Sequence, residues 1–256
     1  MGLNFYKYQG TGNDFVMIDN RHEVFDKNNT KLITELCDRR FGIGADGLIL
    51  LENHQNLDFK MIYFNADSSR SFCGNGARCA VAFAKQLNII KDKASFEAID
   101  GEHNATISEG IVKLHMHDVG AVEKYSEHVF LDTGSPHHIE MKENIQNLDI
   151  KTEGARIRYG EPYNEVGSNV NFVKKLSDTV FEVRTYERGV EDETLSCGTG
   201  VTAVAIAMHS LEKTDDNTVT LQTQGGELQV SFEEKDGYYS NIWLCGPAKL
   251  VFQGKV

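Results

Sequence analysis

Two stretches of sequence decide the fold: CGNGARCAVAFA at residues 73–84 and CGTGVTAVAIAM at residues 197–208. The second repeats the pattern of the first after an offset of 124 residues. Three shorter pairs match in the same order at offsets of 122 to 125 residues: 59–65 with 181–187, 11–13 with 133–135, and 100–102 with 225–227. Four matches in the same order at a nearly constant offset predict two copies of one αβ unit. The repeat period is too long for a solenoid protein.

The repeat predicts an α+β fold of two pseudo-symmetric halves. Both matching stretches read as helices that begin after a cysteine, and the second is apolar on nearly every side, which is typical of a buried helix. The rest of the chain is dominated by short segments rich in β-branched and aromatic residues, at 3–9, 14–19, 57–64, 111–116, 180–186, 219–223 and 239–244. We therefore expect each half to be a curved, mostly antiparallel, barrel-like sheet around a central helix.

The boundaries follow from where the second copy begins and ends. We expect the N-terminal repeat to span residues 1–117 and to be completed by the tail 247–256. The C-terminal repeat would then span residues 118–246, with the active site in the cleft between the two repeats.

Two further helices are expected outside the repeated stretches. One covers residues 30–40, where Thr30 can cap the start and Gly42 can end the helix. Cys37 on its apolar stripe is expected in the core. A weaker helical pattern covers residues 149–159.

The composition excludes several classes of function. A formal net charge of −12 argues against nucleic acid or an anionic membrane as the partner, since both recruit basic surfaces. The chain contains no apolar run of about 18 residues that would span a membrane. The N-terminus has no apolar segment typical of a signal peptide, so a cytoplasmic location is expected. The five cysteines include no CxxC pair, which disfavours a disulfide framework or a zinc ribbon.

Other local signals carry less chemistry. The GxGxxG match at 42–47 follows no buried strand, and the segment 48–51 after it reads as a strand rather than a helix, so a dinucleotide site is rejected. His115 and His117 alternate along one strand-like segment, and His137 and His138 are adjacent, but no Asp, Glu or Cys completes a ligand set with them, so no metal is expected. Cys79 is expected to pack in its helix, and the acidic run 191–193 is expected to be solvated. Arg78 can be either a surface arginine or a support for the site.

The most informative chemical feature is a cysteine directly before Gly-x-Gly and a helix in each repeat, Cys73 in one and Cys197 in the other. A helix N-terminus exposes unpaired N–H groups and a partial positive charge, which bind a carboxylate and favour a nearby thiolate. A single such cysteine is more often a buried filler, but the same arrangement in both repeats indicates one shared site.

Two thiols suit the inversion of a carbon centre. If the repeats face each other, one thiolate can remove the α-proton of a small amino acid while the opposite thiol returns a proton. No lysine motif for PLP is evident in the sequence. The carbanion would then rely on positioning and preorganised electrostatics.

Seven motifs span nearly the whole chain: GTGNDF (10–15), FNAD (64–67), CGNGARC (73–79), GSPH (134–137), NV (169–170), ERG (187–189) and ETLSCGTG (193–200). In these motifs and their order, the chain resembles the diaminopimelate epimerase family. The resemblance implies a cofactor-independent isomerase, usually a homodimer, that converts LL-diaminopimelate to meso-diaminopimelate in lysine and peptidoglycan precursor biosynthesis.

The resemblance also implies residue roles. Cys73 and Cys197 would be the acid–base pair, and His137 and Glu187 would tune the two thiols. The backbones of four residues would hold the reacting carboxylate: Gly74, Asn75, Gly198 and Thr199. Five side chains would bind the amines and the distal carboxylate: Asn13, Asn65, Asn169, Glu187 and Arg188.

Three features depart from common family patterns. Ser135 stands where many members have Asn, and Gly47 stands where some have Gln. The segment 190–192 looks one residue longer than the commoner spacing.

Three other functions remain open from the sequence. Related two-cysteine racemases act on proline, hydroxyproline or histidine, although Arg188 beside Glu187 argues against a proline-type substrate. A thiol–disulfide oxidoreductase usually relies on a close CxxC pair, which is missing here. A non-catalytic amino-acid-binding protein would not need two thiols.

Overall fold

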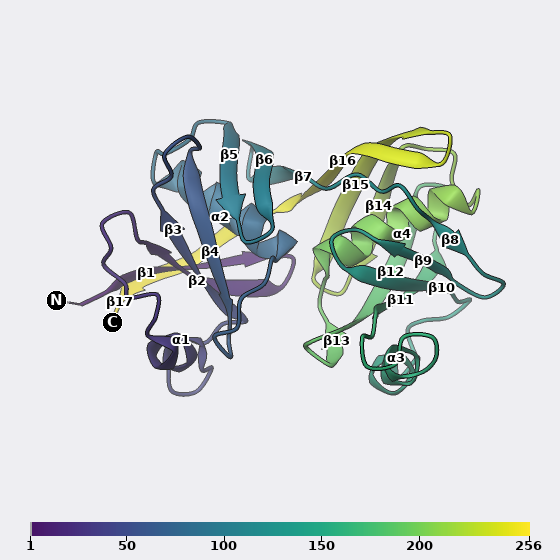
Figure 1. The fold of residues 1–256 in the computed structure, drawn as a ribbon, viewed down its shortest axis with the longest axis horizontal. Coiled ribbons are helices and arrows are strands. Elements are labelled where there is room, and N and C mark those ends of the chain that lie inside the picture. The colour runs from purple at the N-terminus through teal and green to yellow at the C-terminus, as the bar shows by residue number, and fades with distance from the viewer. Residues whose placement is uncertain (1) are drawn as a thin grey trace. The chain divides into compact units, whose positions relative to one another are not determined.

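The computed structural model describes residues 2–256 and divides into two compact units. Unit 1 consists of Met1–Leu114 and Gly246–Val256, and unit 2 consists of His115–Cys245. Each unit contains one sheet, one central helix and one outer helix (Figure 1). Among residues 2–256, no helix combines the length and apolar character needed to cross a bilayer.

In unit 1 the central helix is α2 (Gly74–Gln86). In order across the sheet, the strands are β17 (Lys249–Lys255), β1 (Asn4–Gly10), β2 (Asn13–Asp19), β3 (Gly47–Glu52), β4 (Phe59–Asn65), β5 (Lys93–Ala98), β6 (Gly101–Ser108) and β7 (Ile111–His115). The pairs β2–β3 and β4–β5 are parallel and the others antiparallel. Helix α2 contacts strands from β17 to β6, so the sheet curves around it.

In unit 2 the central helix is α4 (Gly198–Ser210). The strands run β8 (Glu123–Lys124), β9 (Val129–Asp132), β10 (Pro136–Met141), β11 (Asn169–Lys175), β12 (Val180–Glu187), β14 (Thr218–Thr223), β15 (Gly226–Lys235) and β16 (Tyr238–Pro247), with β13 (Asp192–Thr194) paired to the end of β12. Helix α4 contacts strands from β9 to β15, and the sheet again curves around its helix.

The two units share one topology, which confirms the predicted pseudo-symmetric fold. Strands β2 to β7 correspond in order and direction to β10, β11, β12, β14, β15 and β16. Even a left-handed backbone position repeats: φ is +130° at Gly101 and +133° at Gly226. Backbone angles in this region favour glycine, which explains why both repeats have glycine at this position. The C-terminal strand β17 pairs with β1 as β8 pairs with β9.

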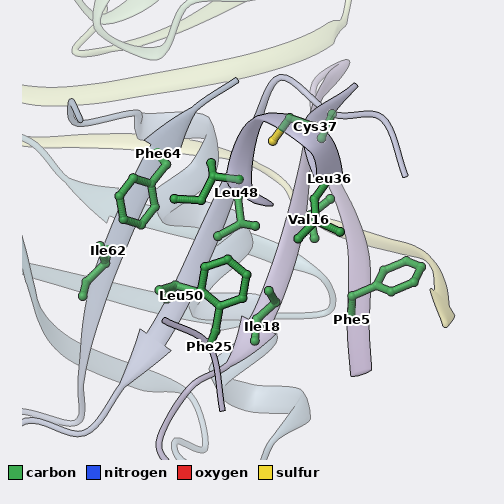
Figure 2. Close-up of a cluster of buried hydrophobic side chains, with 12 residues drawn as sticks. Phe5, Val16, Ile18, Phe25, Leu36, Cys37, Leu48, Leu50, Ile62 and Phe64 are labelled. Atoms are coloured by element: carbon green, nitrogen blue, oxygen red, sulfur yellow. The ribbon is translucent and has the colours of Figure 1, made fainter. Parts of the chain in front are cut away.

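A second core lies on the outer face of each sheet. In unit 1, α1 (Thr30–Cys37) packs Ile33, Leu36 and Cys37 against β2 and β3. Figure 2 shows Leu36 and Cys37 beside Val16 and Leu48 of these strands. This confirms the core position predicted for Cys37. In unit 2, α3 (Ile150–Tyr159) occupies the equivalent place, and Asp149 caps it.

Helix α1 differs from its prediction at both ends. The capping side chain is Asn29, whose Oδ1 accepts the N–H of Leu32 at 3.1 Å. The helix ends at Cys37 rather than at residue 40, because the carboxylate of Asp38 accepts the N–H groups of Arg40 and Phe41, both at 2.7 Å. These bonds turn the chain away from the helix axis.

Each of the seven expected strand segments coincides with a strand. Strand β3 coincides with the strand-like segment 48–51, whereas the following strands were not predicted from the sequence pattern: β5, β6, β8, β9, β10, β11, β13, β15 and β17.

Candidate active site

In unit 1, helix α2 begins at Cys73, whose backbone is extended with φ −135° and ψ 112°. The first turn of the helix, Gly74–Gly76, is buried beside this residue. Its N–H groups have no partners within the helix and carry partial positive charge. The Sγ atom of Cys73 lies 3.4 Å from Oδ1 of Asn13.

Asn13 is oriented by a carboxylate. Its Nδ2 donates to Asp46, so its Oδ1 is directed to the thiol of Cys73. The same Oδ1 accepts Nδ2 of Asn75 at 3.4 Å. An acceptor beside the sulfur suits a protonated thiol, which can donate its hydrogen.

A cluster of charges holds the strand behind Asn13. Lys7 lies 2.8 Å from Asp14, and Arg39 donates to both Asp14 and Asp46 at 2.7 Å. Burial would raise the pKa of Asp14, but hydrogen bonds and charges from Arg39 and Lys7 outweigh burial and lower this pKa to about 2. The carboxylate therefore stays ionised at neutral pH, and the cluster persists.

Two more polar side chains of unit 1 support the segments around Cys73. Asn65, at the end of β4, donates through Nδ2 to Oγ of Ser69 at 2.9 Å and of Ser71 at 3.2 Å. Arg78 in α2 is fully buried and donates to Oγ1 of Thr11 at 2.9 Å. Arg78 is therefore not a surface arginine but a support for the turn that leads to Asn13.

In unit 2, helix α4 begins at Cys197 with a similar backbone, φ −122° and ψ 116°. Its side chain is buried, and its Sγ lies 3.4 Å from Oγ1 of Thr199. Thr133 steadies this turn by donating to the backbone oxygen of Thr199 at 2.9 Å. The two sulfurs thus meet different groups, an amide oxygen in unit 1 and a hydroxyl in unit 2.

Strand β10 places His137 beside this hydroxyl. Its Nε2 lies 3.0 Å from Oγ1 of Thr199 and 3.0 Å from Oγ of Ser135, and the two hydroxyls are 3.1 Å apart. Burial, together with the charge of Arg188, lowers the pKa of His137 to about 3. The imidazole is therefore neutral at physiological pH.

Asn169 and Arg188 meet at the ends of β11 and β12. Nδ2 of Asn169 donates to the backbone oxygen of Pro136 at 3.0 Å and to Oγ of Ser135 at 3.3 Å. Its Oδ1 accepts the backbone N–H of Arg188 at 2.8 Å. Arg188 is half-buried, and its guanidinium donates to the backbone oxygen of Val166 at 3.0 Å.

Glu187 ends β12, and the acidic run that follows it is not simply solvated as expected. Each of its carboxylates is paired with a cation, which orders the longer turn. The pairs are Glu191 with Arg158 at 3.1 Å, Asp192 with Lys151 at 2.6 Å, and Glu193 with Arg184 at 2.6 Å.

The structure gathers most of the predicted site residues into one set in each unit. The unit 1 set is Cys73, Gly74, Asn75 and Asn13. The unit 2 set is Cys197, Gly198, Thr199, His137, Asn169 and Arg188. Asn65 and Glu187 lie at the ends of the equivalent strands β4 and β12.

Sequence reasoning missed three polar residues of these sets: Asp46, Asn171 and Thr185. A position-by-position comparison of the repeats would have found two of them. At the offset of 122 residues, Asn171 corresponds to Ile49 and Thr185 to Tyr63.

Comparison with known proteins gives a consistent family. A family model described as diaminopimelate epimerase matches residues 5–124 and 129–251. A diaminopimelate epimerase of Flavobacterium psychrophilum is 60% identical over 253 residues, which cover 98% of this chain and 99% of that protein. A diaminopimelate epimerase of Chlorobaculum tepidum is 42% identical, with 96% of this chain and 98% of that protein covered.

Solved structures show the same fold at low sequence identity. A phenazine biosynthesis protein of the PhzF family from Bacillus anthracis matches with a TM-score of 0.76 at 13% identity, covering 100% of this chain and 99% of that chain. A hydroxyproline epimerase from Agrobacterium vitis, with bound trans-4-hydroxy-L-proline, matches with a TM-score of 0.67 at 13% identity. The match covers 100% of this chain and 92% of that chain.

Proposed function

Because the chain belongs to the diaminopimelate epimerase family, we propose that it converts LL-diaminopimelate to the meso isomer with Cys73 and Cys197 as its two acid–base groups. Membership of this family makes the chain an isomerase. One observation carries the mechanistic proposal: each unit begins its central helix at a cysteine with extended backbone.

The two sulfurs together take up one proton and release one proton in each turnover. One cysteine, as thiolate, takes the α-proton and becomes a thiol, which leaves a carbanion at the α-carbon. The other cysteine, as thiol, gives its proton to the opposite face of that carbon and becomes a thiolate. The net change is inversion of the centre, and the proposal requires one sulfur on each face of it.

The helix N-termini supply the electrostatic stabilisation. We assign the backbone N–H groups of Gly74, Asn75, Gly198 and Thr199 to the reacting carboxylate. Such donors are fixed before the reaction and gain strength as negative charge spreads from the α-carbon into the carboxylate. This arrangement needs neither PLP nor a metal ion to hold the carbanion.

The distal end of the substrate sets the specificity in this proposal. Arg188 would bind the distal carboxylate, and the side chains of Asn13, Asn65, Asn169 and Glu187 would contact the amines and carboxylates. His137 and Glu187 would tune the thiols. Both amide hydrogens of Asn169 already bond to Pro136 and Ser135, so Asn169 would contact substrate through Oδ1.

A panel of amino acids tests the substrate assignment. The purified chain is incubated with LL-diaminopimelate, L-proline, trans-4-hydroxy-L-proline and L-histidine, and the products are separated on a chiral column. Conversion of diaminopimelate alone supports the proposal. Inversion of a proline-type substrate would overturn it and favour the related racemases, which a hydroxyproline epimerase of the same fold represents.

We further propose a cytoplasmic enzyme of lysine and peptidoglycan precursor biosynthesis that works as a homodimer. Strand β17 of unit 1 exposes three consecutive apolar side chains, Leu250, Val251 and Phe252, which a second copy would cover. Light scattering measures the mass in solution. A particle of twice the 28.7 kDa chain mass supports the dimer, and a monomer at micromolar concentration contradicts it.

A further inference from the structure

We propose that Asn171 is a positioning residue that holds His137 as the tautomer with hydrogen on Nε2, so that the hydrogen bonds of unit 2 run toward the sulfur of Cys197. This inference rests on the proposed role of Cys197 in proton transfer. It concerns a residue buried in β11 that lies one step behind the groups expected to meet substrate.

The orientation of the Asn171 amide is fixed by a backbone group. One end of the amide lies 3.2 Å from the backbone oxygen of His138. That oxygen can only accept, so this end of the amide must be the NH₂ group. The other end accepts the hydroxyl of Thr185 at 2.9 Å.

The same NH₂ group lies 3.1 Å from Nδ1 of His137. Because Asn171 donates there, Nδ1 must accept and carries no hydrogen. A neutral imidazole has one hydrogen, which therefore sits on Nε2. Burial keeps the ring neutral, since the pKa of His137 lies far below the physiological range, at about 3. His137 thus acts as a donor to the hydroxyl pair and not as a base.

A second amide fixes the direction of the remaining bonds. Asn169 is oriented by the backbone oxygen of Pro136 and by the backbone N–H of Arg188. Its second amide hydrogen goes to Oγ of Ser135 at 3.3 Å. The hydroxyl hydrogen of Ser135 can then reach Oγ1 of Thr199 at 3.1 Å.

Thr199 is the last member of this chain of hydrogen bonds. Its Oγ1 is placed to accept from Nε2–H of His137 and from the hydroxyl of Ser135. Its own hydrogen is left to point at Sγ of Cys197, 3.4 Å away. A donor aimed at sulfur favours the thiolate form.

Unit 1 shows that the fold does not need these polar groups. At the offset of 122 residues, His137, Asn171 and Thr185 correspond to Phe15, Ile49 and Tyr63, which are all buried. Buried polar groups cost free energy unless they are fully hydrogen-bonded. Unit 1 fills the equivalent positions with two apolar residues and a tyrosine, so the fold itself does not require the histidine–amide pair of unit 2.

The glycines of the two helices differ in the same way. A β-carbon on Gly76 would lie 3.0 Å from Ile49 and 3.4 Å from Phe15. A β-carbon on Gly200 would lie 2.7 Å from Oδ1 of Asn171 and 3.3 Å from Cε1 of His137. The start of α4 is thus packed directly against the proposed positioning pair.

Nitrogen-15 NMR of histidine-labelled protein reads the tautomer directly. The signal of His137 is identified among the nine histidines by its absence in His137→Phe, a change that copies the residue at the equivalent position of unit 1. In the parent we expect a bare Nδ1 and a protonated Nε2, unchanged between about pH 5 and pH 9. A hydrogen on Nδ1 in the parent would overturn the proposal.

Two variants test the role of Asn171. Asn171→Asp replaces the donor by an acceptor, so a hydrogen should appear on Nδ1. Turnover should fall by about 10²- to 10⁴-fold with a smaller change in KM, since a histidine locked in the wrong tautomer costs up to about 10⁴-fold. Asn171→Leu removes the donor at similar volume and should give nitrogen signals averaged between the two tautomers. Parent-like signals in both variants would overturn the proposal.

Alkylation of Cys197 gives a readout that does not depend on turnover. The iodoacetamide reaction of its peptide is followed by mass spectrometry across pH. In Asn171→Leu the alkylation rate of Cys197 should rise at a pH about one unit higher than in the parent. The reason is that the Thr199 hydroxyl is no longer held in the direction that donates to the thiolate. An unmoved profile contradicts the proposed chain of bonds.

Val170→Ala serves as the control for lost packing in β11. Val170 is the neighbour of Asn171, and its side chain belongs to the separate core under α3. The nitrogen-15 signals of His137 and the alkylation profile of Cys197 should both stay parent-like in this variant. If the parent itself does not epimerise diaminopimelate, the proposed function fails, while the tautomer measurement still decides this inference.

Discussion

Oδ1 of Asn171 lies 2.7 Å from the point that a β-carbon on Gly200 would occupy. This approach is closer than a side chain at position 200 permits. The second glycine of the Cys-Gly-x-Gly pattern is therefore explained in unit 2 by the residues it packs against. It lets a buried amide and imidazole reach the first turn of α4.

Gly200→Ala should disturb this half of the site more than Gly76→Ala disturbs the other. The new methyl group of Gly200→Ala meets a hydrogen-bonded amide oxygen that cannot move without losing its partners. In Gly76→Ala the closest atom is Cδ1 of Ile49 at 3.0 Å, the flexible end of a side chain. We expect a loss of stability of about 1–3 kcal/mol for Gly200→Ala, measured by urea unfolding. Equal losses in both variants would contradict this account of Gly200.

Replacing either thiol should nearly abolish epimerisation. Cys73→Ala removes the base for one face of the α-carbon, and Cys197→Ala removes it for the other. Because the pair acts as a unit, the double variant should be little slower than either single one. Turnover of diaminopimelate is followed by chiral chromatography. A single variant with parent-like turnover would contradict the two-base mechanism.

Arg188→Ala should weaken the handling of diaminopimelate by removing the proposed partner of the distal carboxylate. Losing one member of such a pair costs about 2–5 kcal/mol in kcat/KM. Arg156→Ala is the matched control, since this arginine is exposed on α3 and forms a surface pair with Glu153 at 3.0 Å, which contributes little. If both variants keep parent kinetics, Arg188 does not bind substrate.

Asp14 should stabilise the protein in a way that depends on pH. Its pKa is lowered from 3.8 to about 2, because contacts with Arg39 and Lys7 outweigh burial. A lowered pKa means that the stabilisation is complete above about pH 4 and is lost as pH falls toward 2.

The measurement compares unfolding of the parent and Asp14→Asn from pH 6 to pH 2. We expect a difference of about 2 kcal/mol at pH 6 that shrinks below pH 4. A difference that stays constant over this range would mean that Asp14 does not titrate as the Lys7–Arg39 cluster requires.

The sequence was sufficient to predict the two central helices and the place of both thiols at the start of these helices. The repeated Cys-Gly-x-Gly pattern is local, and the helix begins directly at each cysteine. The end of α1 was misjudged because Asp38 stops the helix through bonds to Arg40 and Phe41, which compete with a helical pattern that continues in the sequence.

The surroundings of the thiols could not be predicted in the same way. Strand β10 begins at Pro136 and carries two adjacent histidines, which gives it no alternation of apolar and polar residues. The position of His137 depends on its pairing with Asn169, more than 30 residues away. Such contacts are set by sheet register, which no local pattern encodes.

The origin of the new α-hydrogen tests the two-base account most directly. The protein is incubated with LL-diaminopimelate in heavy water, and the first few per cent of meso product are analysed by mass spectrometry. We predict one solvent deuterium at the inverted carbon of the product, while the remaining substrate still carries its original hydrogen. Meso product that retains the hydrogen of the substrate would show return by a single base and would contradict the account.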